Sequence, residues 1–330
     1  MLSIKDIAIV ILNWNGKDLL ETFLPSVTQY SEGATIYIAD NASTDDSVDF
    51  ITSNYPEIKI IQNSTNEGYA KGYNDALKHV DESIYCLLNS DIEVTPNWLQ
   101  PIINTFNSDS ETVIIQPKIL DYNNRSFFEY AGAAGGFIDK YGYPFCRGRI
   151  FETIEKDTGQ YNDTIPIFWA SGACFFIRKS AFEGLNGFDA SYFAHMEEID
   201  LCWRAFNQGH VAKYVEQSTV FHVGGATLKS SSSKKTYLNF RNSLITLVKN
   251  TDRNVFFRTV WRMKLDGIAA FRFLIQGKPL HFWAIVKAHL SFYGSLSRIL
   301  KQRKSVPKRY GYYKTNSIVW SYFIKQQRHF

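Results

Sequence analysis

The sequence predicts an α/β fold, in which a mostly parallel mixed sheet is flanked by helices and followed by a helical, basic C-terminal extension. Two observations predict this class. Apolar runs of strand length alternate with segments of helical spacing, as in a βαβ series. Farther along, the charge changes sign: residues 251–330 hold 16 Lys and Arg against 2 Asp and Glu, whereas residues 1–250 hold 20 against 30. We therefore expect an α/β body and a basic extension that differ in the sign of their charge.

The expected elements alternate in a regular order. Unbroken apolar stretches are typical of strands that are buried on both faces, and apolar residues three or four positions apart are typical of helices. The expected strands are 7–12, 35–39, 58–61, 83–88, 113–115, 167–170, 173–177 and one that ends at 220–222. The expected helices are 17–30, one beginning near 44–46, one opening at 66–72 and reaching 79, 96–107, one within 190–208, and those beyond 233.

Two stretches lack such a period. Residues 117–165 are rich in glycine and aromatic residues, and we interpret them as loops with a small hairpin over the site. Ser230 to Lys235 is a low-complexity stretch, which is typical of a flexible loop.

Cysteine spacing and hydropathy bear on the cellular compartment. The four cysteines form no C-x-x-C pair, which argues against a zinc site and a disulfide framework and favours reduced thiols in a cytosolic protein. The N-terminus lacks the layout of a signal peptide, and the sequence has no apolar run of about eighteen residues that would predict a transmembrane helix.

Carboxylates stand at the ends of two expected strands. Asp91 comes just after the apolar run 83–88, and Asp40 closes the strand 35–39. In open α/β sheets this edge is where ligands bind. Asp91 can hold Mg²⁺ or Mn²⁺ against a diphosphate, or it can cap the following turn. Asp40 can accept a hydrogen bond from a ribose or a pyrimidine base, or it can form an Asx turn.

The segment 195–204 is the densest acidic cluster beside apolar positions. Glu197 or Glu198 can act as a general base toward an acceptor hydroxyl. On a helix, Asp200 and Arg204 are spaced to form an ion pair. The alternative is that this segment is simply the solvated, acidic start of a helix.

One histidine and two glycines complete the candidate positions. His222 ends an apolar strand, where it is either structural or a metal ligand beside Asp91. Gly68 and Gly72 lie where a helix begins, which suits a backbone close to a ligand. The G-x-G-x-x-G fingerprint is missing, which counts against a dehydrogenase.

Six ordered motifs resemble a known family. They are VILNWN, ADNASTDDS, NEGYAKGYN, LLNSDIEV, SGACFFIRKSAFEGLNGFDASYFAHMEEIDLCWRA and FHVGG. In order and spacing, residues 5–245 are similar to the family-2 inverting glycosyltransferases of the GT-A fold. The closest resemblance is to the bacterial rhamnosyltransferase-like branch that builds surface polysaccharide. The resemblance implies a catalytic domain at 1–245, and the extension at 246–330 lies outside it.

The resemblance implies roles for the matched residues. Asp40 would contact the pyrimidine base. The donor-binding set would be Asn13, Asp40, Asn41, Asn66, Gly68, Lys71, Asn89 and Ser90. Asp91 would end the D-x-D-type element and hold Mg²⁺ or Mn²⁺ together with His222. Asn89 stands where an acidic residue is often found, so the metal would have fewer protein carboxylates. Glu198 would be the base, with Glu197 as the alternative, and Trp169 and Gly172 would border the acceptor pocket.

The implied function is that of a metal-dependent inverting glycosyltransferase. It would move a sugar from dTDP-rhamnose or a UDP-hexose to a hydroxyl of a glycan or lipid-linked glycan in surface polysaccharide synthesis. Two alternatives stay open: a sugar-nucleotide pyrophosphorylase-like enzyme, for which NWNGKD is a poor phosphate loop, and a non-catalytic nucleotide-sugar or carbohydrate-binding protein. The lack of membrane spans and of a Q-x-x-R-W element disfavours a processive synthase.

The extension invites two interpretations. Residues 253–300 mix Lys and Arg with Phe, Trp, Leu and Ile. Basic side chains beside aromatic anchors are typical of helices lying in a membrane interface. That agrees with a lipid-linked acceptor at the cytoplasmic face of an inner membrane. The alternative is a helical subdomain packed on the core or on a second subunit, as in a homodimer. Nucleic-acid binding is not expected, because no recognised module accompanies the charge.

Overall fold

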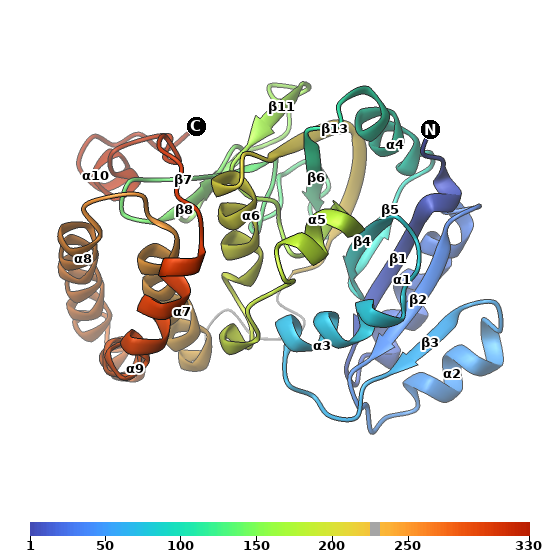
Figure 1. Ribbon diagram of the computed structural model, residues 1–330, viewed down its shortest axis with the longest axis horizontal. Coiled ribbons are helices and arrows are strands. Elements are labelled where there is room, and N and C mark those ends of the chain that lie inside the picture. The colour runs from blue at the N-terminus through green and yellow to red at the C-terminus, as the bar shows by residue number, and fades with distance from the viewer. Residues whose placement is uncertain (225–231) are drawn as a thin grey trace.

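A large mixed sheet with helices against it forms the body of the protein, and a cluster of helices adjoins it (Figure 1). The structure is a computed structural model that describes residues 1–224 and 232–330. The strand order is β11-β13-β6-β12-β4-β1-β2-β3, and β5 pairs with β13. The strands of this sheet are β1 (Ile7–Asn13), β2 (Thr35–Asp40), β3 (Lys59–Gln62), β4 (Ile84–Asn89), β5 (Ile92–Val94), β6 (Thr112–Asp121), β11 (Thr164–Ile167), β12 (Cys174–Arg178) and β13 (Val211–His222).

Helices connect these strands and build the C-terminal part. They are α1 (Lys17–Tyr30), α2 (Ser47–Asn54), α3 (Tyr69–Ala76), α4 (Leu99–Ser108), α5 (Lys179–Gly184), α6 (Glu197–Asn207), α7 (Ser233–Asn250), α8 (Val255–Ile275), α9 (Pro279–Ser305) and α10 (Ile318–Phe323). None of these helices, within the described residues, is both long and apolar enough to cross a membrane.

The parallel half of the sheet brings several strand ends to one edge. β1 pairs in parallel with β2 and β4, and β2 pairs in parallel with β3. Antiparallel β12 then joins β4 to β6. In β1, Ile7 to Ile11 are at most 2% exposed, as expected for an apolar strand covered on both faces. The predicted α/β class is therefore confirmed, and the four cysteines are buried free thiols.

The segment 117–165 is more ordered than expected. β6 continues to Asp121, and a second sheet follows, with the strands β7 (Gly136–Ile138), β8 (Pro144–Cys146), β9 (Arg149–Ile150) and β10 (Thr153–Ile154). The interpretation as loops with one small hairpin was wrong. Strands of two or three residues are too short to show a period of two.

Only part of the expected loop at Ser230 to Lys235 lies within the residues that the structure describes. Residues 230 and 231 lie outside the described residues. Residues 233–235 form the first turn of α7, so the loop prediction is wrong for these three. Low complexity in so short a stretch does not prevent a helix once its other face is packed.

The extension packs on the sheet domain. The Tyr312 ring lies 4.4 Å from the Trp203 ring, centroid to centroid, and Tyr312 Oη donates to the carbonyl of Lys140 over 2.7 Å. The Ile318 N–H donates to Asp139 Oδ2 over 3.0 Å. The boundary expected at residue 245 falls inside α7, which also contacts α6. Where the chain divides into domains stays a prediction.

Candidate active site

Two polar residues stand side by side where β1 and β2 end. The register pairs Asn13 with Asp40, and both are buried. Asn13 Nδ2 donates to Asp40 Oδ1 over 3.2 Å, and the Ser43 N–H donates to Asp40 Oδ2 over 3.0 Å. Asn13 Oδ1 has no hydrogen-bond partner among the described residues. An unpaired buried acceptor is costly, so this oxygen is suited to receive a ligand donor.

The loop before α3 approaches the same edge. Asn66 Oδ1 accepts hydrogen bonds from Asn41 Nδ2 over 2.9 Å and from the Gly68 N–H over 3.0 Å. Gly68 has a φ of +89°, and a Cβ at this position would lie 2.4 Å from the carbonyl oxygen of Phe193. Only glycine tolerates both conditions. This glycine thus lets the α3 start lie against the loop that precedes α6.

Strand pairing places Asp91 beside His222. β5 pairs with β13 so that His222 lies opposite Ile92. His222 Nε2 is 3.1 Å from Asp91 Oδ1, and His222 Nδ1 is 3.3 Å from Glu129 Oε1. Asn89 Nδ2 lies 3.4 Å from His222 Nε2. Burial disfavours the imidazolium, but the hydrogen bonds to Asp91 and Glu129 outweigh it and raise the pKa of His222 to about 10.

Glu129 is a site residue that the sequence did not reveal. It comes from the stretch without a period, stands alone between aromatic residues and carries no motif. Its Oε2 also accepts the Ala131 N–H over 2.5 Å, which fixes the carboxylate. Histidines that bind metals usually donate their second ring N–H to such a carboxylate, which sets the ring's tautomer and orientation.

The Asp91–His222 pair fits a metal ion that is shared with a ligand. Among residues 1–224 and 232–330, no group of three or more His, Cys, Asp or Glu is arranged to hold a metal by itself. The pair offers a carboxylate and an imidazole in contact, with Glu129 behind the imidazole. Mg²⁺ and Mn²⁺ prefer oxygen ligands, and Mg²⁺ is commonly held by one or two protein groups plus phosphate oxygens and water.

Both candidate bases stand at the start of α6. Glu197 is buried, and its Oε2 has no partner among the described residues, whereas Glu198 is partly exposed. Burial raises the pKa of Glu198 to about 7. Burial and the charge of Glu198 raise the pKa of Glu197 well above its usual range. The alternative of a solvated helix start was wrong, because periodicity along one helix does not show what covers it.

Gly172 links Glu198 to the Asp91–His222 pair. A Cβ at Gly172 would lie 3.8 Å from Glu198 Cγ and 3.2 Å from Tyr69 Oη, which itself donates to the Gly172 carbonyl over 2.8 Å. The next carbonyl, that of Ala173, accepts the Asn89 N–H over 2.9 Å. Since Asn89 also reaches His222, Glu198 and the Asp91–His222 pair belong to one edge of the sheet.

The extension fixes the orientation of α6. Asp200 and Arg204 form the predicted ion pair over 2.8 Å, now seen to be buried. Lys249 Nζ and Asn250 Nδ2, both from α7, donate to the same carboxylate over 2.9 and 2.7 Å. Buried charges persist only when paired in this way. The extension therefore contributes to the position of Glu198.

The loop before α6 is strained and is also held from α7. Phe193, His195 and Met196 have positive φ values of 66°, 69° and 75°. Non-glycine residues adopt such values at a cost, and they do so where surrounding contacts enforce them. Asn242 Nδ2 supplies such contacts, because it donates to the carbonyls of Ala194 and His195 over 2.9 and 2.8 Å.

Three predicted residues lie apart from these clusters or at their margin. Trp169 is buried, and its indole N–H donates to the Phe137 carbonyl over 2.7 Å. Ser90 is half-buried beside Gly16. Lys71 pairs with Asp75. The roles of Trp169, Ser90 and Lys71 in binding stay predictions.

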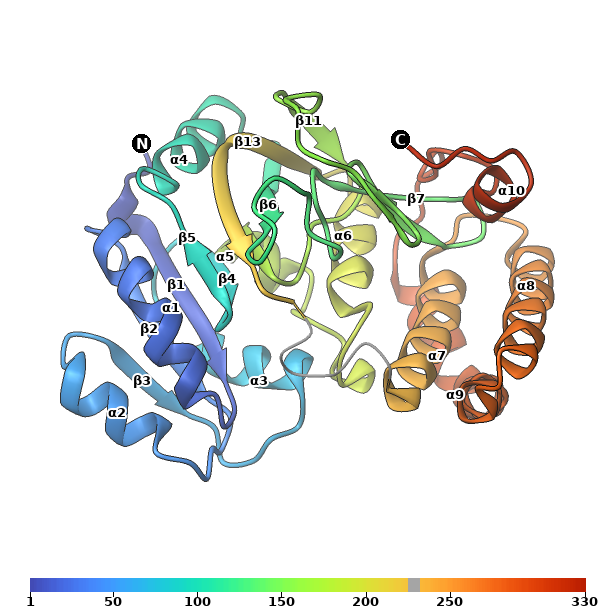
Figure 2. The same cartoon turned by 180° about the vertical axis from the view of Figure 1, so that it is seen from behind.

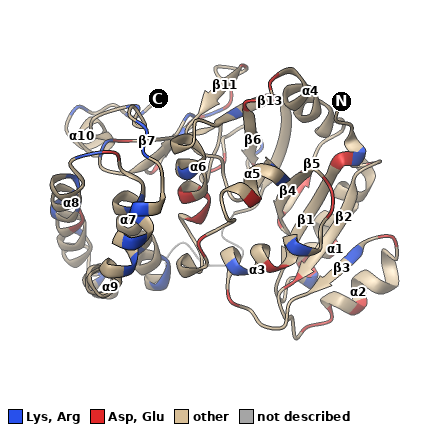
Figure 3. Cartoon of the chain, in the orientation of Figure 1, with Lys and Arg blue, Asp and Glu red and all other residues tan. Residues whose placement is uncertain are grey.

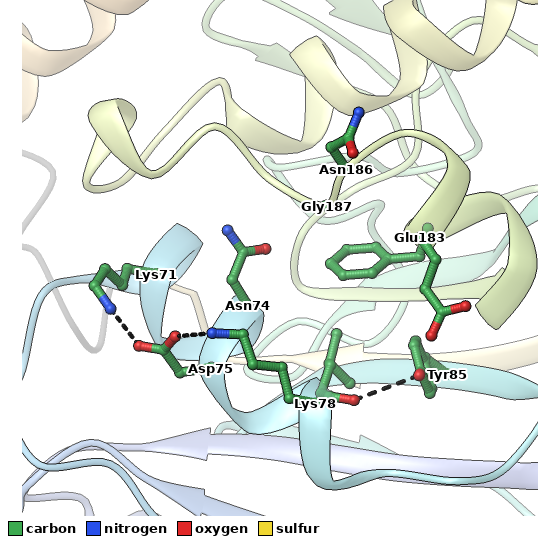
Figure 4. Close-up of a pocket in the computed structure, with 10 residues that line it drawn as sticks. Lys71, Asn74, Asp75, Lys78, Tyr85, Glu183, Asn186 and Gly187 are labelled. Carbon is green, nitrogen blue, oxygen red and sulfur yellow. Dashed lines mark hydrogen bonds and ion pairs between the residues drawn. The ribbon is translucent and has the colours of Figure 1, made fainter.

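Lys71 also lines a surface pocket of about 410 Å³ formed by residues of α3, β4 and α5 (Figure 4). Both lysines that line it are already paired, since Asp75 binds Lys71 and Lys78. At the sheet edge, by contrast, Asn13 Oδ1 and Glu197 Oε2 are buried without hydrogen-bond partners among the described residues. We therefore place the candidate site at the sheet edge and not at this pocket.

The mostly parallel mixed sheet flanked by helices has GT-A-like structural neighbours. The mannosyltransferase PcManGT from Pyrobaculum calidifontis, solved with GDP-Man and Mn²⁺, matches this structure with a TM-score of 0.51 and 13% identity, over 88% of this chain and 75% of that one. At that identity the likeness shows the fold alone.

Sequence comparison gives the family. Glycosyl transferase family 2 matches residues 8–185, so the chain belongs to this family, whose transferases are inverting. An N-acetylglucosaminyl-diphospho-decaprenol L-rhamnosyltransferase of Mycobacterium tuberculosis is 25% identical over 218 residues, 62% of this chain and 71% of the relative. A low-salt glycan biosynthesis hexosyltransferase of Haloferax volcanii is 21% identical over 292 residues, 86% of this chain and 85% of the relative. The chain is thus a glycosyltransferase, which sets aside the pyrophosphorylase-like and non-catalytic alternatives.

Proposed function

We propose that this glycosyltransferase is metal-dependent and moves a sugar from a nucleoside-diphosphate sugar to a hydroxyl of a glycan or lipid-linked glycan. The observation that carries the proposal is the convergence of Asp91, His222 and Glu198 on the edge that also holds Asn13 and Asp40. We also propose that this transfer is a step of surface polysaccharide synthesis and takes place at the cytoplasmic face of a membrane.

The donor half of the site suits a pyrimidine nucleotide. Asp40 would accept the N3–H of thymine or uracil, and Asn13, Asn41 and the Gly68 backbone would complete the nucleotide pocket. dTDP-rhamnose is the leading donor, supported by the name of the mycobacterial relative, and UDP-hexoses are the second candidate. A Mg²⁺ or Mn²⁺ ion held by Asp91 and His222 would neutralise charge on the leaving diphosphate.

The acceptor half supplies the base. Glu198 accepts the proton of the acceptor hydroxyl, whose oxygen forms a bond to the anomeric carbon as the bond from that carbon to the diphosphate oxygen breaks. One such displacement inverts the anomeric configuration. A carboxyl with a pKa near 7 is well matched to this task at neutral pH. Glu198 is preferred over Glu197 because it is the more accessible, and Gly172 leaves room beside it.

A thermal-shift screen tests the proposal. We expect dTDP-rhamnose or a UDP-hexose to raise Tm in the presence of Mn²⁺ and much less in its absence, and Asp40→Ala to remove the shift. Release of the nucleoside diphosphate on adding glycan acceptors would then establish transfer. Equal shifts with and without Mn²⁺ would contradict the metal assignment, and no shift with any nucleotide sugar would contradict the donor class.

A further inference from the structure

The turn between α8 and α9 exposes an unusual number of large apolar side chains. We call residues 268–290 the α8–α9 corner. Its exposed apolar residues are Ile268, Phe271, Leu274, Ile275, Leu280, Trp283 and Leu290. Ile275 is 87% exposed and Leu280 is 70% exposed, on either side of the turn. Contiguous apolar surface on this scale marks an interaction site.

Contacts between aromatic rings join the apolar side chains of α8 and α9 into one patch. The Phe271 ring on α8 lies 6.1 Å from the Phe282 ring on α9, centroid to centroid. The Phe282 ring lies 5.3 Å from that of Trp283. The exposed aromatic groups of the two helices are therefore continuous across the turn.

The charge around this patch has one sign. Arg272, Lys278 and Lys287 are exposed on the corner. Both carboxylates of residues 251–330 are buried: Asp252 Oδ1 lies 2.8 Å from Arg258 Nη1, and Asp266 Oδ1 lies 2.8 Å from Arg262 Nε. Figure 3 shows the scarcity of acidic residues among these helices. The exposed formal charge of the extension is therefore positive.

We propose that the α8–α9 corner docks on an anionic lipid bilayer, an inference that rests on the proposed function for its lipid-linked acceptor. Aromatic and aliphatic side chains would enter the interface, while Arg272, Lys278 and Lys287 would meet the headgroups. A second copy of the chain is the less suitable occupant. A twofold contact through this corner would set the same three cations against their copies, without an exposed carboxylate of the extension to neutralise them.

The position of the corner agrees with this function. In Figures 1 and 2, the carboxyl ends of β1 and β4, the first turn of α6 and the α8–α9 corner all lie toward the lower side of the molecule. A bilayer at the corner would therefore face the same side as the candidate active site.

Vesicle sedimentation of the full chain tests the proposal. The corner variant is Phe271→Ser/Ile275→Ser. The matched control is Phe256→Ser/Phe257→Ser, which removes similarly exposed side chains from the other end of α8, roughly 25 Å away by helix rise. On phosphatidylcholine vesicles containing about one-third phosphatidylglycerol, we expect the corner variant to lose about tenfold or more in binding and the control to stay near wild type. Lys278→Gln/Lys287→Gln should weaken binding to the anionic vesicles only.

Three results would overturn the docking surface. They are no sedimentation of the wild type with anionic vesicles, equal binding of the corner variant and the wild type, or a dimer that the corner variant dissociates without any vesicle binding. The nucleotide-dependent thermal shift, measured without vesicles on the same variants, separates the two proposals. We expect it to be unchanged by the corner substitutions. Vesicle binding without any nucleotide shift would refute the proposed function and leave the docking surface standing.

Discussion

The sheet edge gathers buried polar side chains, whereas the C-terminal extension exposes large apolar ones. At the sheet edge, Asn13 Oδ1 and Glu197 Oε2 are buried without partners among the described residues. In the extension, the buried carboxylates of Asp252 and Asp266 are each held by an arginine. Asn250 Oδ1, Thr251 Oγ1 and Arg258 Nε of the extension are also buried without partners among the described residues. What distinguishes the extension is its exposed large apolar side chains, with Ile275 as the extreme case. Buried polar atoms without partners at the ends of parallel strands suit a small polar ligand, whereas contiguous exposed apolar side chains suit an interaction surface.

The largest effect should come from the sheet edge. We expect Glu198→Gln to lower kcat by about 10³-fold or more, because the amide cannot accept the acceptor proton. Donor affinity, followed by thermal shift or calorimetry, should change little. Glu197→Gln is the matched control and should cost less, since Glu197 is the more buried of the two. Normal turnover in Glu198→Gln would remove Glu198 from the role of base.

The next largest effect should come from the contact between the sheet domain and the C-terminal extension. Lys249→Met leaves Asp200 and Asp189 without the cation that they share. We therefore expect the free energy of unfolding to fall by about 3 kcal/mol. Chemical denaturation measures this. The control is Glu21→Gln at the exposed Lys17–Glu21 pair, expected to cost under about 0.5 kcal/mol. Similar losses in both variants would show that the extension does not stabilise the α6 region through this charge.

Removing the carboxylate behind His222 should weaken metal binding. We expect Glu129→Gln to reduce Mn²⁺ affinity in the presence of nucleoside diphosphate by about 10- to 100-fold, because the imidazole loses its orienting partner. Titration followed by electron paramagnetic resonance reports the affinity directly. Glu152→Gln, an exposed carboxylate of the same stretch, is the control. An unchanged Mn²⁺ affinity in Glu129→Gln would mean that Glu129 does not support metal binding by Asp91 and His222.

The smallest effect concerns pH. With the pKa of Glu198 near 7, kcat/KM should fall about tenfold for each pH unit below 7, since the protonated carboxyl cannot act as a base. The free energy of unfolding should change with pH in the opposite direction, decreasing as pH rises. The folded state holds this proton more tightly than the unfolded chain, so the contribution of Glu198 is favourable at low pH and is lost as pH rises through 7. A flat rate profile between pH 5 and about 8 would contradict the assignment.

Local patterns were enough to predict the strands that carry the site. The apolar runs before Asn13, Asp40 and Asn89 fold as buried strands that end at one edge. The i,i+4 spacing also predicted the Asp200–Arg204 pair, which is present. What failed was the segment 117–165, where very short strands carry no period, and with it the recognition of Glu129.

Sequence by itself determined the fold class and the residues at the strand ends, because both depend on the spacing of apolar residues along the chain. Tertiary structure alone decided that Glu129 faces His222, that Lys71 turns to Asp75, and that α8 and α9 leave an apolar corner uncovered. The physical reason is that burial and pairing depend on which elements pack together. Spacing within a single element contains no record of its neighbours.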